Sequence, residues 1–320
     1  ATLEENYRIA PQAHGHTTEI IDLFPLRSAS RESALRLLAV TSKGEVALLG
    51  GSGWRTMNSV NLPPADPVER AAVSLQGGWM ALAQATFVSV APITKGQLRA
   101  DSTHTSILLD LKTRVMSLDF DPNGRSLLIG AADGRVYRWR FLDRAQIDPK
   151  FGRDKRLERY VGATNLVSAV VFHPEGRLFF SGDWGGQLNA WLRYDADAFG
   201  GEYDKNLFVG RFYTDQDTRM KSESVAGVAI EHLRVSQDGE LLAVALQNGV
   251  LQWWQVRGFK KIAEAQAHKG LIRSLALSSD GYSAVTLGRD GQVRAWQLSK
   301  LTEEFAKITY QISSGGEASA

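Results

Sequence analysis

The sequence predicts an all-β fold built from repeated units of short antiparallel strands. Four segments share one spacing of apolar, glycine and tryptophan positions, and turn-forming residues precede nearly all of the glycines. Two weaker copies of the pattern lie upstream. Units of this length bury their apolar faces by stacking on one another, because a single unit cannot do so alone.

Each strong copy starts with an apolar residue, followed by Gly at +9, Gly at +19, an apolar residue at +21 and Trp at +24. The copies run through Val115, Gly124, Gly134, Val136 and Trp139; Val167, Gly176, Gly186, Leu188 and Trp191; Ile230, Gly239, Gly249, Leu251 and Trp254; and Ile272, Gly281, Gly291, Val293 and Trp296. The chain has only eight tryptophans, so four at one offset indicate a structural repeat.

The glycines predict tight hairpins. The residues before them are Asn123, Glu175, Asp238 and Asp280 at the first position, and Asp133, Gly185, Asn248 and Asp290 at the second. Asn-Gly and Asp-Gly pairs supply the positive φ angles that short hairpins need. The segments between the glycines are rich in β-forming residues. Each unit is therefore predicted as three strands joined by two hairpins, with a fourth strand after the Trp.

The upstream copies are less complete. One opens at His16, Ile20 and Leu23 and continues to Leu49, which stands in the place of the Trp. The other runs from Ala71 to Val90 and lacks the second glycine and the Trp. Together they bring the count to six units, and one undetected unit would make seven.

Composition excludes several classes of site. The chain has 320 residues, a formal net charge of +2, 43% apolar residues and no Cys. Disulfides, thiolate zinc sites and Cys nucleophiles are therefore absent. The near-neutral charge gives no basic footprint for nucleic acid. No apolar run approaches the roughly 20 residues of a membrane helix, so no direct membrane insertion is predicted.

The repeat resembles the WD-repeat family, whose units open with Gly-His and close with Trp-Asp. Gly15-His16 matches the opening, and Ala267-His268 nearly does. The tryptophans are followed by Arg140, Leu192, Gln255 and Gln297, so the closing Asp is never present. The resemblance covers about residues 5–300. It implies structural roles for His16, His268, Thr286, Asp290, Trp139, Trp191, Trp254 and Trp296, with the family's His, Thr, Asp and Trp hydrogen-bond chain complete only at His268, Thr286, Asp290 and Trp296.

The resemblance further implies a β-propeller of four-stranded antiparallel blades, six detected and seven allowed. Residues 5–13 are expected to form the outer strand of the last blade and so close the ring. The propeller would be a single domain over residues 1–300, with insertions at 141–160 and 193–225. Residues 301–320 would be a partly disordered tail that begins with a short helix over Lys300 to Lys307.

Two surfaces are candidates for partner binding. The insertion at 193–225 holds six aromatic residues, Tyr194, Phe199, Tyr203, Phe208, Phe212 and Tyr213. These either form a partner surface or fold back onto the blades. The second surface lies beside the second hairpin turns, at Ala132, Trp184, Gln247 and Arg289, where Trp184 either contacts a partner or packs on the next blade. The insertion at 141–160 reads as a solvated loop of mixed charge.

These observations favour a non-catalytic protein-interaction scaffold, a subunit of a larger complex. We predict protein partners, with no cofactor, no metal, no nucleic acid and no small-molecule ligand. One alternative is a ligand-binding or enzymatic propeller that uses a central channel. Another is an extracytoplasmic domain of a transport or envelope assembly. The cytoplasm is slightly favoured, although the lack of Cys and the Ala at residue 1 also fit export.

Overall fold

The computed structural model describes the chain as strands and their connections. It describes residues 20–26, 36–43, 45–50, 55–61, 67–74, 78–93, 107–144, 147–148, 153–154, 156–163, 165–192, 219–224, 227–300 and 306–311. The regular secondary structure in these ranges consists of β-strands. The chain forms two compact units, the first Ala1–Val115 with Ser314–Ala320 and the second Met116–Ser313.

The first unit contains two four-stranded antiparallel sheets. The first sheet comprises β1 (Ile20–Leu26), β2 (Arg36–Thr41), β3 (Glu45–Gly50) and β4 (Arg55–Asn61). The second sheet comprises β5 (Arg70–Ser74), β6 (Trp79–Gln84), β7 (Phe87–Pro92) and β8 (Ile107–Asp110). They lie where the two weaker sequence copies were expected. Leu38 and Val40 of one sheet pack in a common core with Met80 and Leu82 of the other.

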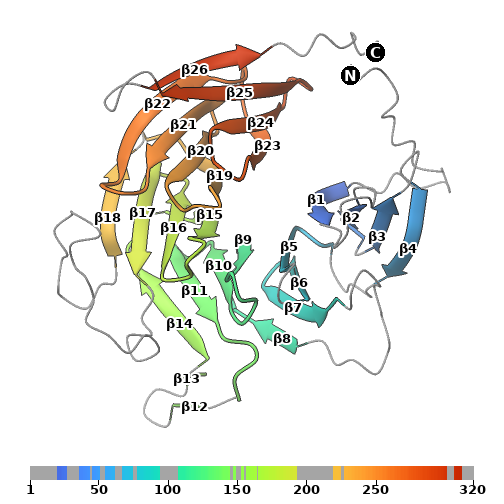
Figure 1. The fold of residues 1–320 in the computed structure, drawn as a ribbon. Helices are drawn as coiled ribbons and strands as arrows, with labels where there is room; N and C mark the ends of the chain where they lie inside the picture. The colour runs from blue at the N-terminus through green and yellow to red at the C-terminus, as the bar shows by residue number, and fades with distance from the viewer. Residues whose placement is uncertain are drawn as a thin grey trace. The chain divides into compact units, whose positions relative to one another are not determined.

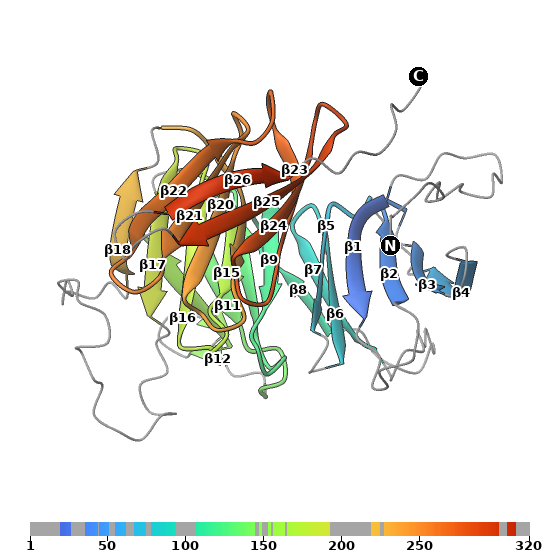
Figure 2. The same ribbon diagram turned by 45° about the horizontal axis from the view of Figure 1, so that its top comes forward.

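The second unit contains four further sheets, one for each strong sequence copy (Figures 1 and 2). The third sheet has β9 (Val115–Phe120), β10 (Leu127–Ala131), β11 (Arg135–Trp139) and β14 (Leu157–Val161). The fourth has β15 (Val167–Phe172), β16 (Leu178–Asp183), β17 (Gln187–Leu192) and β18 (Arg219–Ser224). The fifth has β19 (Ile230–Val235), β20 (Leu241–Leu246), β21 (Val250–Gln255) and β22 (Lys260–Gln266). The sixth has β23 (Ile272–Leu277), β24 (Ser283–Gly288), β25 (Val293–Lys300) and β26 (Ala306–Gln311).

The predicted hairpins are present in these four sheets. Gly134 has a φ of 76° in the turn between β10 and β11, and Gly291 has a φ of 73° in the turn between β24 and β25. A side chain at such an angle would be strained, which explains the glycines of the repeat. The Trp at +24 lies on the third strand of each sheet and is buried every time. The expected all-β architecture of four-stranded antiparallel sheets is therefore confirmed.

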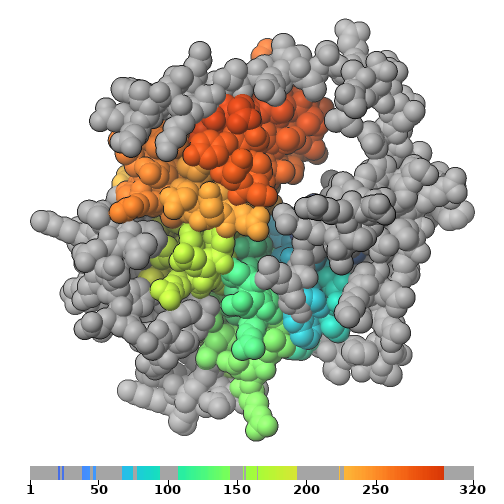
Figure 3. All heavy atoms as spheres, in the orientation of Figure 1, coloured from blue at the N-terminus to red at the C-terminus, as the bar shows by residue number. Residues whose placement is uncertain are grey.

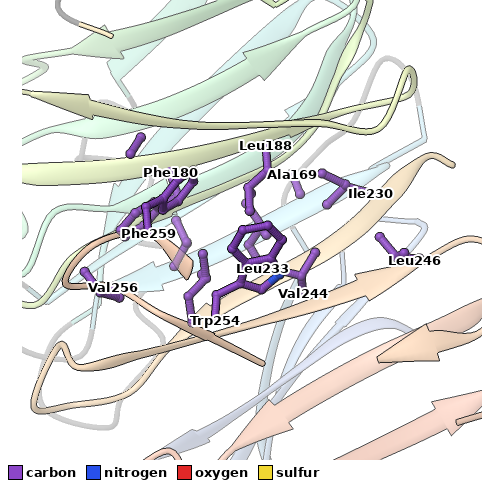
Figure 4. Packing of buried hydrophobic residues seen from close by; sticks show 13 residues of the cluster. Ala169, Phe180, Leu188, Ile230, Leu233, Val244, Leu246, Trp254, Val256 and Phe259 are labelled. Carbon is purple, nitrogen blue, oxygen red and sulfur yellow. The ribbon is translucent and has the colours of Figure 1, made fainter. Parts of the chain in front are cut away.

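The core of the second unit lies between successive sheets, which adjoin as bands of colour from green to red in Figure 3. In Figure 4, Phe180 and Leu188 of the fourth sheet pack with Leu233 and Trp254 of the fifth. Gly182 shows how closely these sheets approach, because a Cβ atom there would overlap the side chain of Ile230. Both faces of β16 are consequently buried.

The outer strand of the sixth sheet corrects one prediction. β26, formed by Ala306–Gln311, pairs with β25 in the place that was assigned to residues 5–13. The expected helix over Lys300 to Lys307 is also wrong, because Lys300 ends β25 and Lys307 lies in β26. Ile308, Thr309 and Tyr310 are strand-forming residues, which explains the preference. Residues 5–13 lie outside the described residues.

Both predicted insertions contain an outer strand. The segment 141–160 holds the short hairpin β12 (Ile147–Asp148) and β13 (Arg153–Asp154), and then most of β14. The segment 193–225 ends in β18, which pairs with β17. Each insertion is therefore an extension of the hairpin between a third and a fourth strand. The single domain over residues 1–300 stays a prediction.

Candidate functional site

One end of the second unit carries the hairpin turns between the second and third strands. In three sheets the turn is tied down by the same backbone bond. The N–H of Trp184 donates to the Leu166 carbonyl at 3.1 Å, that of Gln247 to Ala229 at 2.9 Å, and that of Arg289 to Leu271 at 2.8 Å. In each pair the acceptor is the residue just before the first strand of its sheet. We call the end of the fourth to sixth sheets that holds Trp184, Gln247 and Arg289 the turn face.

Trp184 is held out of the core on this face. Its side chain is 48% exposed, unlike the four repeat tryptophans, which are buried. The preceding residue, Asp183, is fully buried and accepts hydrogen bonds from the N–H of Gln187 at 2.8 Å and of Asn165 at 3.2 Å. The carboxylate therefore braces both segments beside Trp184. An indole on such a fixed turn is available for contact without much loss of conformational entropy.

Gln247 and Arg289 are also exposed, as is Ala132 in the corresponding turn of the third sheet. Trp184 and Arg289 were both predicted as partner-binding residues, and the structure places them at the same position of their respective turns. The aromatic residues Tyr194, Phe199, Tyr203, Phe208, Phe212 and Tyr213 lie outside the described residues, and so does His16. Their assignment stays a prediction.

Asp290, which follows Arg289 in the turn, belongs to a hydrogen-bonded group with His268, Thr286 and Trp296. The His268 ring lies 3.0 Å from Asp290 through Nδ1 and 2.8 Å from the Thr286 hydroxyl through Nε2. The indole N–H of Trp296 donates to the same hydroxyl at 2.9 Å. With a neutral ring that carries its proton on Nδ1, every donor has an acceptor: the indole to Thr286, Thr286 to Nε2, and Nδ1 to Asp290.

The chain of four residues ties the turn to the buried face of the sheet. Burial raises the pKa of the Asp290 carboxyl, but hydrogen bonds from the Gln292 N–H and the His268 ring outweigh this, so the pKa lies below its usual value. A Cβ atom at Gly288 would overlap the His268 ring, so a glycine is needed there. The arrangement supports the turn that carries Arg289 and exposes no reactive group, because His268 and Thr286 are both buried.

The other repeat tryptophans find different partners. Trp191 donates to the Ser181 hydroxyl at 2.8 Å, and Trp254 donates to the Gln252 side chain at 3.0 Å. The indole nitrogen of Trp139 is buried and has no hydrogen-bond partner among the described residues. The spacing places the rings alike, but the partner of the N–H depends on residues that the spacing does not include.

The structure also contains buried and partly buried charged groups that the sequence did not single out. Arg138 is buried and donates to both carboxylate oxygens of Glu158, at 2.9 and 3.1 Å, and to Ser126 at 3.0 Å. In the sequence, Arg138 could have been noticed by its position directly before Trp139 on an expected strand. Asp119, on β9, accepts a hydrogen bond from the Phe172 N–H at 2.7 Å. Burial raises the pKa of Asp119 to about 6, against the lowering effect of that N–H.

Arg138 and Asp119 have different partners, the Glu158 carboxylate and the Phe172 N–H. Within the described ranges, no group of three or more His, Asp or Glu side chains is arranged to hold a metal ion. Nor does that part of the chain contain a helix long and apolar enough to cross a membrane. What the turn face offers chemically is a fixed aromatic surface beside exposed polar and charged side chains.

The family model "WD domain, G-beta repeat" matches residues 104–140, 155–191 and 259–297. Each match ends at or within one residue of a repeat Trp, and the last includes His268, Thr286 and Asp290. This chain therefore contains three segments that match WD repeats. The remaining strong copy of the repeat, from Ile230 to Trp254, forms a sheet with the same strand order.

Curated proteins resemble part of the chain at low identity. The chain is 25% identical over 196 residues to "Pre-mRNA-processing factor 19 homolog 2" of Arabidopsis thaliana, covering 61% of this chain and 32% of that protein. It is 22% identical over 207 residues to "WD repeat-containing protein 91 homolog" of Dictyostelium discoideum, covering 62% and 23%. The chain therefore spans about a third or less of the length of these curated relatives.

A solved structure shares the fold. A chain in "Crystal Structure of Mitotic Checkpoint Complex" superimposes with a TM-score of 0.59 at 18% sequence identity, covering 82% of this chain and 73% of that chain. At this identity the likeness concerns the arrangement of the sheets.

Proposed function

We propose that this WD-repeat protein is a non-catalytic scaffold that docks a partner protein on the turn face. The single observation that carries the proposal is Trp184, a residue that is 48% exposed on a turn braced by the buried Asp183 carboxylate. A large aromatic side chain kept in water at a fixed place is a typical anchor of a protein interface.

The mechanism is recognition by a preformed surface. The backbone bonds of Trp184, Gln247 and Arg289 fix the turns to strands whose cores are already packed. Little entropy is then lost when a partner binds, so more of the contact energy appears as affinity. Trp184 would be buried on binding, with the exposed polar side chains of neighbouring turns forming the rim of the contact.

The comparisons support a role inside assemblies. One similar structure is a checkpoint complex, and one relative is named as a pre-mRNA-processing factor. We propose that this chain likewise acts as a subunit of a larger complex. We also propose that its six four-stranded sheets are six blades of a propeller, since each has the same strand order.

A second docking element is proposed in residues 194–217, where the aromatic residues of the longer insertion lie. These residues connect β17 to β18, and the ends of the segment are anchored by the pairing of Trp191 with Arg219. A segment so anchored can extend from the sheet without altering it. This element is independent of Trp184 and is tested separately.

The test is affinity capture of the full chain from its native extract, followed by mass spectrometry. Trp184→Ala is expected to lose the partners that the unaltered chain retains. Leu142→Ala is the matched control, because Leu142 is 46% exposed in the connection after β11, away from the hairpin turns of the turn face.

A third variant replaces residues 194–217 by a Gly/Ser linker and keeps β18 intact. Partners lost only in this variant would place the docking surface on the insertion instead of the turn face. Equal recovery by all variants, or no enrichment by the unaltered chain, would contradict the proposal that the turn face docks proteins.

A further inference from the structure

The sixth sheet gathers three exposed cations at its end of the turn face. The Arg289 N–H donates to the Leu271 carbonyl at 2.8 Å, which fixes these two residues side by side. Lys269 precedes Leu271 by two residues and Arg273 follows it by two. All three charged side chains are exposed. A short stretch of surface therefore carries a formal charge of +3 from Lys269, Arg273 and Arg289.

These charges are not neutralised by the carboxylates around them. In the described part of the chain, neither an ion pair nor a side-chain hydrogen bond is found for Lys269, Arg273 or Arg289. Asp290, the adjacent acid, is engaged by His268 at 3.0 Å and by Arg294 at 3.7 Å. Glu231, which stands on β19 where Arg273 stands on β23, is also engaged by another group. The positive potential of this end is therefore available to a ligand.

The turn face changes in chemistry from one sheet to the next. The fourth sheet presents Trp184, the fifth Gln247 and the sixth Arg289 at the same turn position. The second residue of the first strand in each sheet (β15, β19 and β23) changes too, from Ser168 to Glu231 to Arg273. The fifth sheet packs between the other two. The surface thus runs from an aromatic side chain on the fourth sheet, across the Gln247 amide and the Glu231 carboxylate on the fifth, to a cluster of cations on the sixth.

We infer that the turn face selects an acidic segment of a partner protein, with an apolar or aromatic residue on Trp184 and carboxylates toward Arg289, Lys269 and Arg273. The inference rests on the proposed docking function and names the chemistry of the partner. Like charges set close together repel one another, and an acidic ligand relieves that repulsion while it steers association. The Debye length is about 8 Å at physiological salt, so binding should weaken as salt is raised.

The experiment selects ligands without a prior choice of charge. A phage library of random 12-residue peptides is panned on the immobilised full chain at low salt. The enriched peptides are expected to carry net negative charge together with a large apolar residue. The most enriched peptide is then synthesised with a fluorophore, and its binding to the chain and its variants is measured by fluorescence polarisation.

Arg289→Glu is expected to weaken this peptide by at least about tenfold at 0.05 M salt, and by much less at 0.5 M salt. Lys269→Glu should act in the same direction with a smaller effect. The matched control is Arg125→Glu, which makes the same charge change in the β9–β10 hairpin, at the opposite end of its sheet from the β10–β11 turn. That control is expected to change binding less than about twofold.

The outcomes separate the inference from the docking proposal. If the enriched peptides depend on Trp184 but carry no excess of acids, or ignore Arg289→Glu, the acidic specificity is wrong and the docking face stands. If enriched peptides bind equally well to Trp184→Ala, both ideas fail. If the library yields no binding peptide, the inferred recognition of a short acidic segment is overturned, while capture of a folded partner still tests the docking proposal.

Discussion

The third and sixth sheets each have a tryptophan at the same repeat position, but the surroundings of its indole N–H differ. Trp296 donates to Thr286, which in turn is linked to His268 and Asp290. The residue of the third sheet that matches Thr286 is Ile129, and the buried indole nitrogen of Trp139 has no partner. The repeat therefore preserves the volume of the ring. Of these two sheets, the sixth has the hydrogen-bond chain in addition.

The third sheet has a different polar network in its place. Arg138 joins β11 to Glu158 of β14, and the Tyr160 hydroxyl donates to the same carboxylate at 2.8 Å. This network links the third and fourth strands, whereas the chain from His268 links the turn to the second and third strands. One fold thus tolerates two placements of buried polarity, provided the apolar positions are kept.

Removal of Glu158 should have the largest effect in this comparison. Glu158→Ala leaves the buried Arg138 guanidinium without its carboxylate, which is expected to lower the free energy of unfolding by roughly 3 kcal/mol. Urea unfolding measures the change. The double variant Arg138→Met with Glu158→Leu should recover part of it, because both charges of this pair are removed while the Tyr160 hydroxyl still loses its acceptor. If the double variant is as unstable as the single one, apolar packing and not the unpaired charge is the cause.

Thr286→Val should be the next largest change. It keeps the shape of the side chain but removes the hydroxyl from both His268 and Trp296, with an expected loss of about 2 kcal/mol. Thr286→Ser keeps the hydroxyl and should recover part of the stability in the same urea assay. Equal losses in both variants would show that the methyl group, and not the hydrogen-bond chain, matters here.

Ile129 allows the converse experiment in the third sheet. Ile129→Thr places a hydroxyl where Thr286 stands in the sixth sheet, and Ile129→Val has the same shape without it. Because the Trp139 N–H lacks a partner, the Thr variant should be more stable than the Val variant by about 1 kcal/mol. Buried Val-to-Thr changes usually destabilise, so the opposite order would mean that the new hydroxyl does not reach the indole.

Asp119 predicts a smaller effect that depends on pH. Its pKa is raised by burial to about 6, so the folded protein binds this proton more tightly than the unfolded chain does. The charged carboxylate therefore costs stability above pH 6, and the cost disappears as pH falls through 6 toward its ordinary value near 4. Asp119→Asn should be more stable than the unaltered chain by about 1 kcal/mol at pH 7.5.

That difference should vanish below about pH 4, where Asp119 is protonated in both states. Unfolding by urea at pH 7.5, 6 and 4 follows it, with His173→Asn measured as a second titration variant. Burial lowers the pKa of His173, so this residue destabilises the fold as pH falls below about 6.5, opposite in sign to Asp119. A stability gap for Asp119→Asn that is constant with pH would point to packing instead of charge.

The repeat spacing was sufficient to predict the hairpins, whereas His268, Thr286, Asp290 and Trp296 were grouped by the resemblance to the WD-repeat family. The glycines and the apolar positions carry that information, because tight turns and buried strand faces restrict residue type locally. The exposure of Trp184 was left open from the sequence. It depends on Asp183, whose carboxylate is buried by the three-dimensional contacts of the turn.

Outer strands were the weakest part of the sequence prediction. β26 was taken for a tail and β14 and β18 for parts of insertions, because outer strands have one neighbour and little periodicity. In β22 the exposed residues include Lys260, Lys261 and Glu264, so such a strand resembles a solvated loop in sequence. The choice between the N-terminal segment and β26 as partner of β25 depends on long-range pairing, which local residue preferences do not encode.

The pairing of Trp191 with Arg219 has a practical consequence for engineering. Residues far apart in the sequence are neighbours across one ladder, so the chain leaves the fourth sheet and returns to it at almost the same point. A fluorescent protein, an enzyme or an affinity tag whose own termini are close together can replace the intervening residues without a new requirement on the sheet, although the second docking element proposed there is then lost. The hairpin between β17 and β18 is therefore a natural place to attach cargo to this scaffold.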